Sequence, residues 1–231
     1  MKIYTHYSFD LWLTLIKSNP SFKKERALWF YRNFNPKKKS IEEVELTFRN
    51  VDLMCNSINE NTGKNIDADE MYLIVICALN DYSTDFVAID VEYIYTEIEK
   101  ILFSYPPNIY CSQTVETLDI LKQKTNSTFN ILSNTAFIRG NTLKIIMNHL
   151  NLSPFFDFQI YSDEIGISKP HKAIFQLMID SVNTIHKKDI SLQKIIHIGD
   201  NIKADIIGAS NLGLSALQIN SNQNTILNIL D

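Results

Sequence analysis

Glycine is scarce in the first 139 residues of this chain of 231 residues. Gly63 is the one glycine in that stretch, whereas the other five of the six glycines follow it. Glycine marks tight turns between strands and helices and places where two backbones approach closely. Its distribution therefore predicts an α/β arrangement for the later part of the chain and a mainly helical stretch before it.

Cysteines, long apolar runs and excess charge are scarce or absent as well. The three cysteines include no CxxC pair, so neither a disulfide framework nor a zinc site is predicted, and a reducing cytoplasm fits. The longest apolar run, Met71 to Leu79, is too short to cross a bilayer, and the N-terminal residues lack the apolar stretch of a signal peptide. A formal net charge of -4 gives no reason to expect nucleic-acid binding. We expect a cytoplasmic protein with no membrane or nucleic-acid partner.

Helix signals dominate between about residues 17 and 104. Ser40 with Glu43, and Asp67 with Glu70, have the spacing of a capping box, and apolar residues follow each pair at helical intervals. Two further segments, one before and one after them, also carry apolar residues on one helical face. Four helices with short connections predict a small helical bundle.

Strands and helices alternate after Pro106 and Pro107, which stop a helix and stiffen the chain. One more strand is expected before the helical stretch. Strands that alternate with helices predict a parallel sheet with right-handed crossovers. The expected strands are Tyr4–Phe9, Phe129–Leu132, Phe156–Tyr161, Lys194–Ile198 and Leu217–Ile219.

Polar side chains follow four of these strands. In a parallel sheet the carboxyl ends of the strands meet at one rim, where ligands bind. That rim would hold three carboxylates, one ammonium and short polar groups. The residues are Asp10 and Thr14 after the first strand, Ser133 and Asn134 after the second, Lys169 after the third, and Asp200 and Asp205 after the fourth.

This set of side chains suits covalent catalysis by a carboxylate, which can attack phosphorus or an sp3 carbon. A Mg²⁺ ion held by Asp10 and Asp200 would neutralise much of the charge of a phosphate group. Lys169 would hold the nucleophile and substrate oxygens, and Ser133 would bind the transferring group. Asp205 either reaches the metal through water or orients Lys169.

The segments that carry these residues resemble the four motifs of the haloacid dehalogenase superfamily. The resemblance implies an α/β fold, with a Rossmann-like parallel sheet in the order 3-2-1-4-5 and a helical-bundle cap domain. Residues 1–16 and 105–231 would form the hydrolase core, and residues 17–104 the cap. The matching segments are FDLWLT (Phe9–Thr14), ILSNT (Ile131–Thr135), SKP (Ser168–Pro170) and IGDNIKAD (Ile198–Asp205).

The same resemblance implies roles for single residues. Asp10 would be the nucleophile, and Mg²⁺ would sit on Asp10, the backbone carbonyl of Trp12 and Asp200, with Asp205 as a further member of the metal site. Thr14 and Asn134 would bind the substrate, a small phosphorylated molecule.

The sequence departs from the family pattern at one position. Family phosphatases usually carry a second Asp two residues after the nucleophile, where it protonates the leaving group, but here the residue is Trp12 and Leu13 beside it is apolar too. A positioned general acid is worth about 10²–10⁴-fold in rate. Two acidic residues of the cap, Glu25 and Glu43, are candidate substitutes.

Trp12 and Asp200 favour different reactions. The 2-haloacid dehalogenases have an aromatic residue in place of that Asp, since halide leaves without a proton, but they tend to lack an acid at the position of Asp200. Beside Asp10, a second carboxylate would be repelled unless a cation lay between them. We therefore expect a Mg²⁺-dependent phosphatase. The alternatives are a metal-independent 2-haloacid dehalogenase, a non-catalytic protein that binds a phosphate ligand or a partner, and phosphonate chemistry. The sequence predicts neither the substrate's identity nor the oligomeric state.

Overall fold

A five-stranded parallel sheet organises the computed structural model, which describes residues 3–83 and 89–230. Its order is β5-β4-β1-β6-β7, and all four pairings are parallel. Counted without the two short strands β2 and β3, which lie outside this sheet, the order is 3-2-1-4-5, as expected. The strands are β1 (His6–Phe9), β4 (Thr128–Ser133), β5 (Phe158–Tyr161), β6 (Ile195–Gly199) and β7 (Ser215–Gln218).

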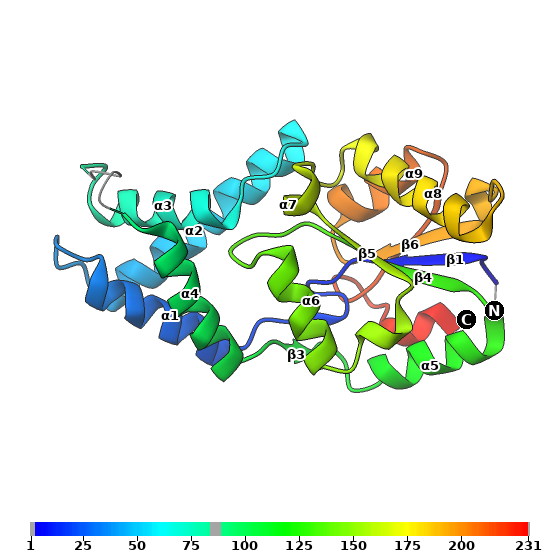
Figure 1. Ribbon diagram of the computed structural model, residues 1–231, viewed down its shortest axis with the longest axis horizontal. Helices are drawn as coiled ribbons and strands as arrows, with labels where there is room; N and C mark the ends of the chain where they lie inside the picture. Colours follow the sequence, from blue (N-terminus) through cyan, green and yellow to red (C-terminus); the bar gives the residue numbers. More distant parts are fainter. Residues whose placement is uncertain (1–2, 84–88, 231) are drawn as a thin grey trace.

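Helices cover both faces of this sheet, with α8 and α9 above it and α5 below it in Figure 1. Side chains alternate between the faces along each strand. Phe129 and Ile131 of β4 therefore belong to one apolar cluster, and Leu132 belongs to a second cluster that contains the buried face of α8. The helices are α5 (Thr114–Thr125), α6 (Gly140–His149), α7 (Ser162–Ile165), α8 (Lys172–His186) and α9 (Gly208–Ser210), with 3-10 turns at Ser153–Phe155, Leu192–Lys194 and Ile226–Leu230.

Four helices form a separate layer at the carboxyl ends of the strands (Figure 1). We call them and their connections the cap. Both expected capping boxes are present: the Ser40 backbone N–H donates to Glu43 at 2.7 Å, and the Asp67 N–H donates to Glu70 at 2.8 Å. The four helices are α1 (Pro20–Asn33), α2 (Ile41–Thr62), α3 (Ala68–Leu79) and α4 (Val91–Ser104).

A two-stranded antiparallel ribbon joins the cap to the sheet, and the sequence did not predict it. Strand β2 (Ile16–Lys17) leads into the cap and pairs with β3 (Asn108–Ile109), which leads out of it. Strands of two residues carry no periodicity, so no sequence pattern indicates them. We propose that core and cap are separate domains that meet near this ribbon. Residues 1–2, 84–88 and 231 of the predicted domain ranges lie outside the described residues.

The helical segment that follows β6 differs from a regular α-helix. Ile202–Ile207 forms a π-helix, in which the Ile206 N–H donates to the Asn201 carbonyl at 3.3 Å, and α9 continues it. The Asn201 side chain caps its first turn, accepting from the backbone N–H groups of Lys203 and Ala204. Wider turns of this kind are frequent at functional sites. This one carries Asp205.

Candidate functional site

Asp10 lies directly after β1, at the rim of the sheet that faces the cap. Its backbone N–H donates to the Ile198 carbonyl at 2.8 Å, which extends the pairing of β1 with β6 by one residue. The residue as a whole is 6% exposed, and its Oδ2 accepts a hydrogen bond from Thr14 Oγ1 at 3.1 Å. Thr14 is itself fully buried, so its hydroxyl holds Asp10 in place.

Lys169 joins two of the predicted carboxylates. Its Nζ lies 2.7 Å from Asp10 Oδ1 and 2.7 Å from Asp205 Oδ1, and all three residues are buried. Burial alone would lower the pKa of Lys169, but the charges of the two carboxylates outweigh it and raise that pKa above its ordinary value. The ammonium is therefore charged at neutral pH and fixes both acids.

Both carboxylate oxygens of Asp205 accept hydrogen bonds. Its Oδ1 also lies 3.1 Å from His197 Nε2, and its Oδ2 accepts from the Asn201 backbone N–H at 2.9 Å. Burial opposes its ionisation, yet Lys169 and His197 together lower its pKa well below the ordinary value. The geometry thus supports the orienting role that the sequence left open beside water-mediated metal binding.

His197 is a member of the site that the sequence did not indicate. It is fully buried in β6, and burial is the main cause of its lowered pKa. A carboxylate only accepts, so His197 Nε2 carries the hydrogen towards Asp205, and Nδ1 accepts from Ser8 Oγ at 2.9 Å. The available signal was its position two residues before Gly199, on a strand that ends at the rim.

The Asp200 carboxylate accepts no hydrogen bond or ion pair from another side chain among residues 3–83 and 89–230. Its backbone carbonyl accepts from Gln218 at 3.0 Å and from the Ser221 hydroxyl, which fixes the main chain. Among the described residues, no other side chain donates a hydrogen bond to its carboxylate. Burial, followed by the charges of Asp10 and Asp205, raises its pKa to about 7. Such a group is stabilised by a bound cation.

The acidic residues fit a magnesium ion. One ligand oxygen from each of Asp10, Asp200 and Asp205 lies within 4.8 Å of the other two, and hard oxygen ligands of this kind suit Mg²⁺. Burial raises the pKa of Asp10 to about 6 despite the nearby Lys169. No hydrogen bond among the described residues ends on the Trp12 carbonyl oxygen, so this predicted ligand is available as well.

The last residue of β4, Ser133, and the residue after it, Asn134, lie beside the loop that carries Lys169. Asn134 accepts from the Lys169 backbone N–H at 2.7 Å and donates to the Lys169 carbonyl at 3.0 Å. Ser133 is fully buried, and its hydroxyl donates to the Asn134 carbonyl at 3.0 Å. The structure brings both residues to the site, with the Asn134 amide engaged inside the protein. Their predicted contacts with a substrate stay predictions.

Position 12 offers no acid. Trp12 is half-buried, and Leu13 adopts a left-handed backbone conformation with φ of 57° and is 51% exposed. Glu43 cannot replace the missing acid, because it is engaged in the capping box that begins α2. The later end of that helix reaches the site instead: Glu60 accepts from Asn201 Nδ2 at 2.8 Å. Glu60 lies about 25 Å further along the helix than Glu43.

No described contact joins Glu25, the other candidate substitute, to the rim. It lies in α1 and is half-buried. Sequence reasoning missed Glu60 because helix periodicity assigns a face to each residue but does not say which end of α2 meets the core.

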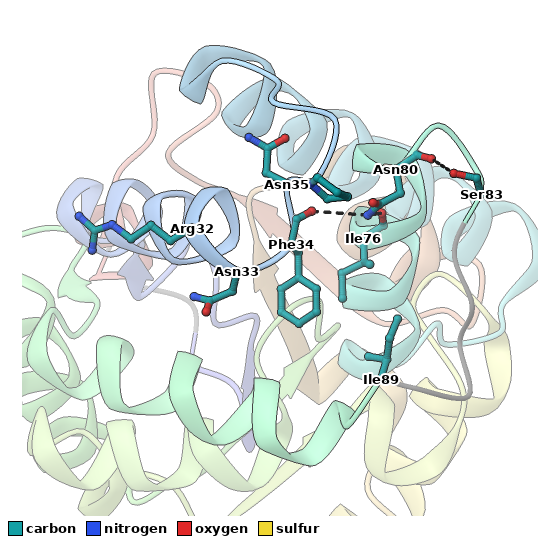
Figure 2. A pocket seen from close by; sticks show the side chains of 9 residues that line it. Arg32, Asn33, Phe34, Asn35, Ile76, Asn80, Ser83 and Ile89 are labelled. Carbon is teal, nitrogen blue, oxygen red and sulfur yellow. Dashed lines mark hydrogen bonds between the residues drawn. The ribbon is translucent and has the colours of Figure 1, made fainter.

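A cavity of about 510 Å³ lies in the cap, away from these carboxylates. Figure 2 shows its lining side chains, with Asn80 donating to the Phe34 carbonyl at 3.4 Å and Ser83 donating to the Asn80 carbonyl at 2.5 Å. The described residues that line it include no acid, so this cavity lacks the groups for the predicted chemistry.

Within residues 3–83 and 89–230, no helix has the length and apolar character needed to cross a membrane.

Similar proteins of curated function match only part of the chain. A glyceraldehyde 3-phosphate phosphatase of Methanothermobacter thermautotrophicus is 32% identical over 108 residues, which cover 47% of this chain and 43% of that protein. The pyrimidine 5'-nucleotidase YjjG of Escherichia coli is 26% identical over 78 residues, covering 34% of this chain and 32% of that protein. The chain thus matches less than half the length of these relatives.

Solved structures match over almost the whole chain. The putative hydrolase YfnB of Bacillus subtilis, solved with bound magnesium, superimposes with a TM-score of 0.71 at 18% identity, covering 96% of this chain and 92% of that one. The L-2-haloacid dehalogenase of Xanthobacter autotrophicus gives a TM-score of 0.62 at 16% identity, covering 94% and 78%. At these identities the likeness shows the fold.

The family model described as haloacid dehalogenase-like hydrolase matches residues 8–213, a range that begins just before Asp10 and extends beyond Asp205. It therefore includes Asp10, Lys169, Asp200 and Asp205. With the sheet order, the helical cap and this match in agreement, the chain belongs to the haloacid dehalogenase-like hydrolases.

Proposed function

We propose that this hydrolase is a Mg²⁺-dependent phosphatase that acts on a small phosphorylated metabolite, with Asp10 as the nucleophile. The observation that carries the proposal is the Asp200 carboxylate, which lies beside Asp10 and is paired with no other side chain that the structure describes. A carboxylate so placed favours a site that binds a cation, and a metal-independent reaction would gain nothing from it. The phosphatase and nucleotidase names of the partial relatives agree with a phosphorylated substrate.

Asp10 and Asp200, with the carbonyl oxygen of Trp12, would hold the ion. When bound, Mg²⁺ offsets the negative charge shared by the carboxylates and the phosphoryl oxygens. Lys169 keeps Asp10 ionised and oriented, and Asp205 with His197 holds Lys169 in turn.

The first chemical step forms a bond between Asp10 and phosphorus and breaks the ester bond, so that the leaving oxygen departs with the bonding electrons as an alkoxide and takes a proton from water. In the second step, water attacks the phosphoaspartate and releases inorganic phosphate, which restores the Asp10 carboxylate. Trp12 can neither protonate the leaving oxygen nor take a proton from that water. We therefore expect slow turnover of alkyl phosphates and faster reaction when the leaving group is already a good one.

Trp12 is the observation that favours a second candidate, a 2-haloacid dehalogenase. In that reaction Asp10 would attack the carbon that carries the halogen, and halide would leave without needing a proton. The intact Asp200 argues against this candidate, because a metal-independent site would keep an uncompensated carboxylate beside the nucleophile. A phosphate-binding protein without turnover would keep the metal site, but no phosphoaspartate would form and then be hydrolysed.

Phosphate release from p-nitrophenyl phosphate tests the proposal, measured with and without Mg²⁺ and with the Asp10→Asn variant. The expected result is release that requires Mg²⁺ and falls by at least about 10³-fold in Asp10→Asn, because the amide cannot form the covalent intermediate. A thermal melt of the variant controls for folding. Halide release from 2-chloropropionate, in the absence of p-nitrophenyl phosphate turnover, would replace the phosphatase with the dehalogenase.

A further inference from the structure

Asn65 in the connection between α2 and α3 contacts the core at two places, the start of α7 and the loop that carries Lys169. Its Oδ1 accepts hydrogen bonds from Ser162 Oγ at 2.6 Å and from Ser168 Oγ at 3.2 Å. Its Nδ2 donates to Asp67 Oδ1 at 2.7 Å. Because a carboxylate only accepts, this last bond fixes the orientation of the amide and directs its oxygen towards both serines.

The two serines belong to the part of the core that carries the predicted phosphate-binding groups. Both are fully buried. Ser162 Oγ accepts from the Thr135 backbone N–H at 2.8 Å, and Thr135 lies two residues after Ser133. Ser168 directly precedes Lys169. Each serine donates its hydroxyl hydrogen to Asn65, so Asn65 stabilises the start of α7 and the loop before Lys169 in their observed positions.

The side chain of Asn134 closes these contacts into a ring. It accepts from the Lys169 N–H at 2.7 Å and donates to the Lys169 carbonyl at 3.0 Å. It therefore joins the segment after β4 directly to the loop that carries Lys169. Asn65 is the member of the ring that the cap contributes. In order, the ring consists of Asn65, Ser162, Thr135, Asn134, Lys169 and Ser168.

The cap loop is also attached to the core by its backbone. The Ser168 N–H donates to the Gly63 carbonyl at 2.9 Å, and the Asn65 N–H donates to the Gly166 carbonyl at 3.3 Å. Gly63 has φ of +75°, and a Cβ there would lie 2.6 Å from the His171 ring, so the close approach requires glycine. These contacts do not use the Asn65 side chain, and its substitution leaves them available.

We propose that Asn65 is a positioning residue. Through it the seated cap aligns residues 133–135, at the end of β4, with residues 168–169 of the loop that carries Lys169. This inference rests on the proposed phosphatase function for its kinetic consequence but not for its structural one. These two segments take up their catalytic arrangement only when the cap supplies the Asn65 oxygen. A shift of about 1 Å in such groups can cost about 10²-fold in rate.

Asn65→Leu removes the acceptor and keeps the branching of the side chain at Cγ, and Asn61→Leu is the matched control. Asn61 Oδ1 accepts from Lys203 Nζ at 2.6 Å, a contact between cap and core that is exposed and touches neither loop. With p-nitrophenyl phosphate and Mg²⁺, we expect kcat/KM to fall about 10–100-fold in Asn65→Leu and less than about threefold in Asn61→Leu. Inhibition by inorganic phosphate should weaken in parallel in Asn65→Leu alone.

Hydrogen exchange tests the structural part without turnover. We expect faster amide exchange at residues 133–135 and 168–169 in Asn65→Leu than in the wild type or Asn61→Leu, at similar thermal stability. If the wild type fails to release phosphate but this pattern is observed, the proposed function is wrong and the positioning role stands. Unchanged exchange at both loops, or equal effects of the two variants, would overturn the positioning role.

A reciprocal exchange separates this role from loss of packing. Asn65→Asp keeps an acceptor for both serines but sets two carboxylates against each other at Asp67, so it should be impaired. The double variant Asn65→Asp/Asp67→Asn restores a donor opposite the new carboxylate. We expect its phosphate release and loop protection to return to within a few-fold of the wild type. A double variant as impaired as Asn65→Leu would contradict the proposal.

Discussion

Lys169 Nζ lies 2.7 Å from Asp10 Oδ1, and the two side chains are 1% and 9% exposed. A salt bridge at this depth stabilises the fold little compared with an apolar pair, but it is costly to break from one side. The same ammonium holds Asp205 at 2.7 Å, so its removal would leave two buried acids without their cation.

We expect Lys169→Met to lower the free energy of unfolding by about 3 kcal/mol or more at pH 8. The acids would then have pKa values raised above those of the unfolded chain, so folding would take up protons and the loss of stability would shrink as the pH falls. Urea unfolding of wild type and variant at pH 8 and pH 5 measures the loss of stability at each pH. Lys144→Met is the control, because Lys144 pairs with Glu164 at the surface, 43% exposed, and should cost no more than about 1 kcal/mol.

Trp12→Asp should restore the missing general acid. We expect turnover of an alkyl phosphate such as glycerol phosphate to rise by about 10²-fold, and that of p-nitrophenyl phosphate to change much less, because nitrophenolate leaves without a proton. The comparison of the two substrates separates acid catalysis from a general effect on the site. Unchanged alkyl phosphate turnover in a folded variant would show that Trp12 is not the cause of slow reaction.

Asp200→Asn should abolish thermal stabilisation by Mg²⁺ and raise the stability of the metal-free protein at pH 8. The pKa of Asp200 is raised to about 7, above the value of an unfolded Asp, so its unfavourable ionisation in the folded state begins above pH 4 and is complete above pH 7. After allowance for its partial solvent contact, we expect a gain of roughly 2–4 °C in Tm at pH 8 and none near pH 4. A variant still stabilised by Mg²⁺ would contradict the metal site.

His6 should make the protein less stable as the pH falls. Burial lowers its pKa to about 4, and its ring is hydrogen-bonded to Thr128 and Asn130 at 2.7 Å each. The unfolded chain takes up the proton near pH 6.5, so stability is lost between pH 6.5 and pH 4, by at most about 1.4 kcal/mol per pH unit from this residue. In urea unfolding, His6→Gln should show a shallower pH dependence than the wild type. His149→Gln is the control, because His149 is exposed. An equal pH dependence of stability in the wild type and both variants would contradict the assignment.

The rim residues were predictable because each follows an apolar strand. Asp10, Lys169 and Asp200 could be assigned to one edge once a parallel sheet was inferred, since the carboxyl ends of parallel strands meet there. The partner of each side chain was not predictable in the same way. His197 lies within a strand, and only the folded sheet brings its Nε2 to Asp205.

The cap contributes residues that no pattern indicated. Ser162 and Ser168 are 97 and 103 residues from Asn65 in sequence, so their hydrogen bonds have no local signature. Glu60 was passed over in favour of Glu43, although both lie on the helix that was correctly predicted. The capping box explains Glu43 fully, and the contact with Asn201 depends on how the helix docks.

The sequence by itself determined the alternation of strands and helices, the capped helices of the inserted bundle and the order in which polar groups follow the strands. These depend on side-chain periodicity and on hydrogen bonds between residues a few positions apart. The tertiary structure alone decided which two acids Lys169 binds, that no other described side chain pairs with Asp200, and which cap residue contacts the loop that carries Lys169. Those outcomes depend on burial and on contacts between residues that lie far apart in the sequence, which no local pattern specifies.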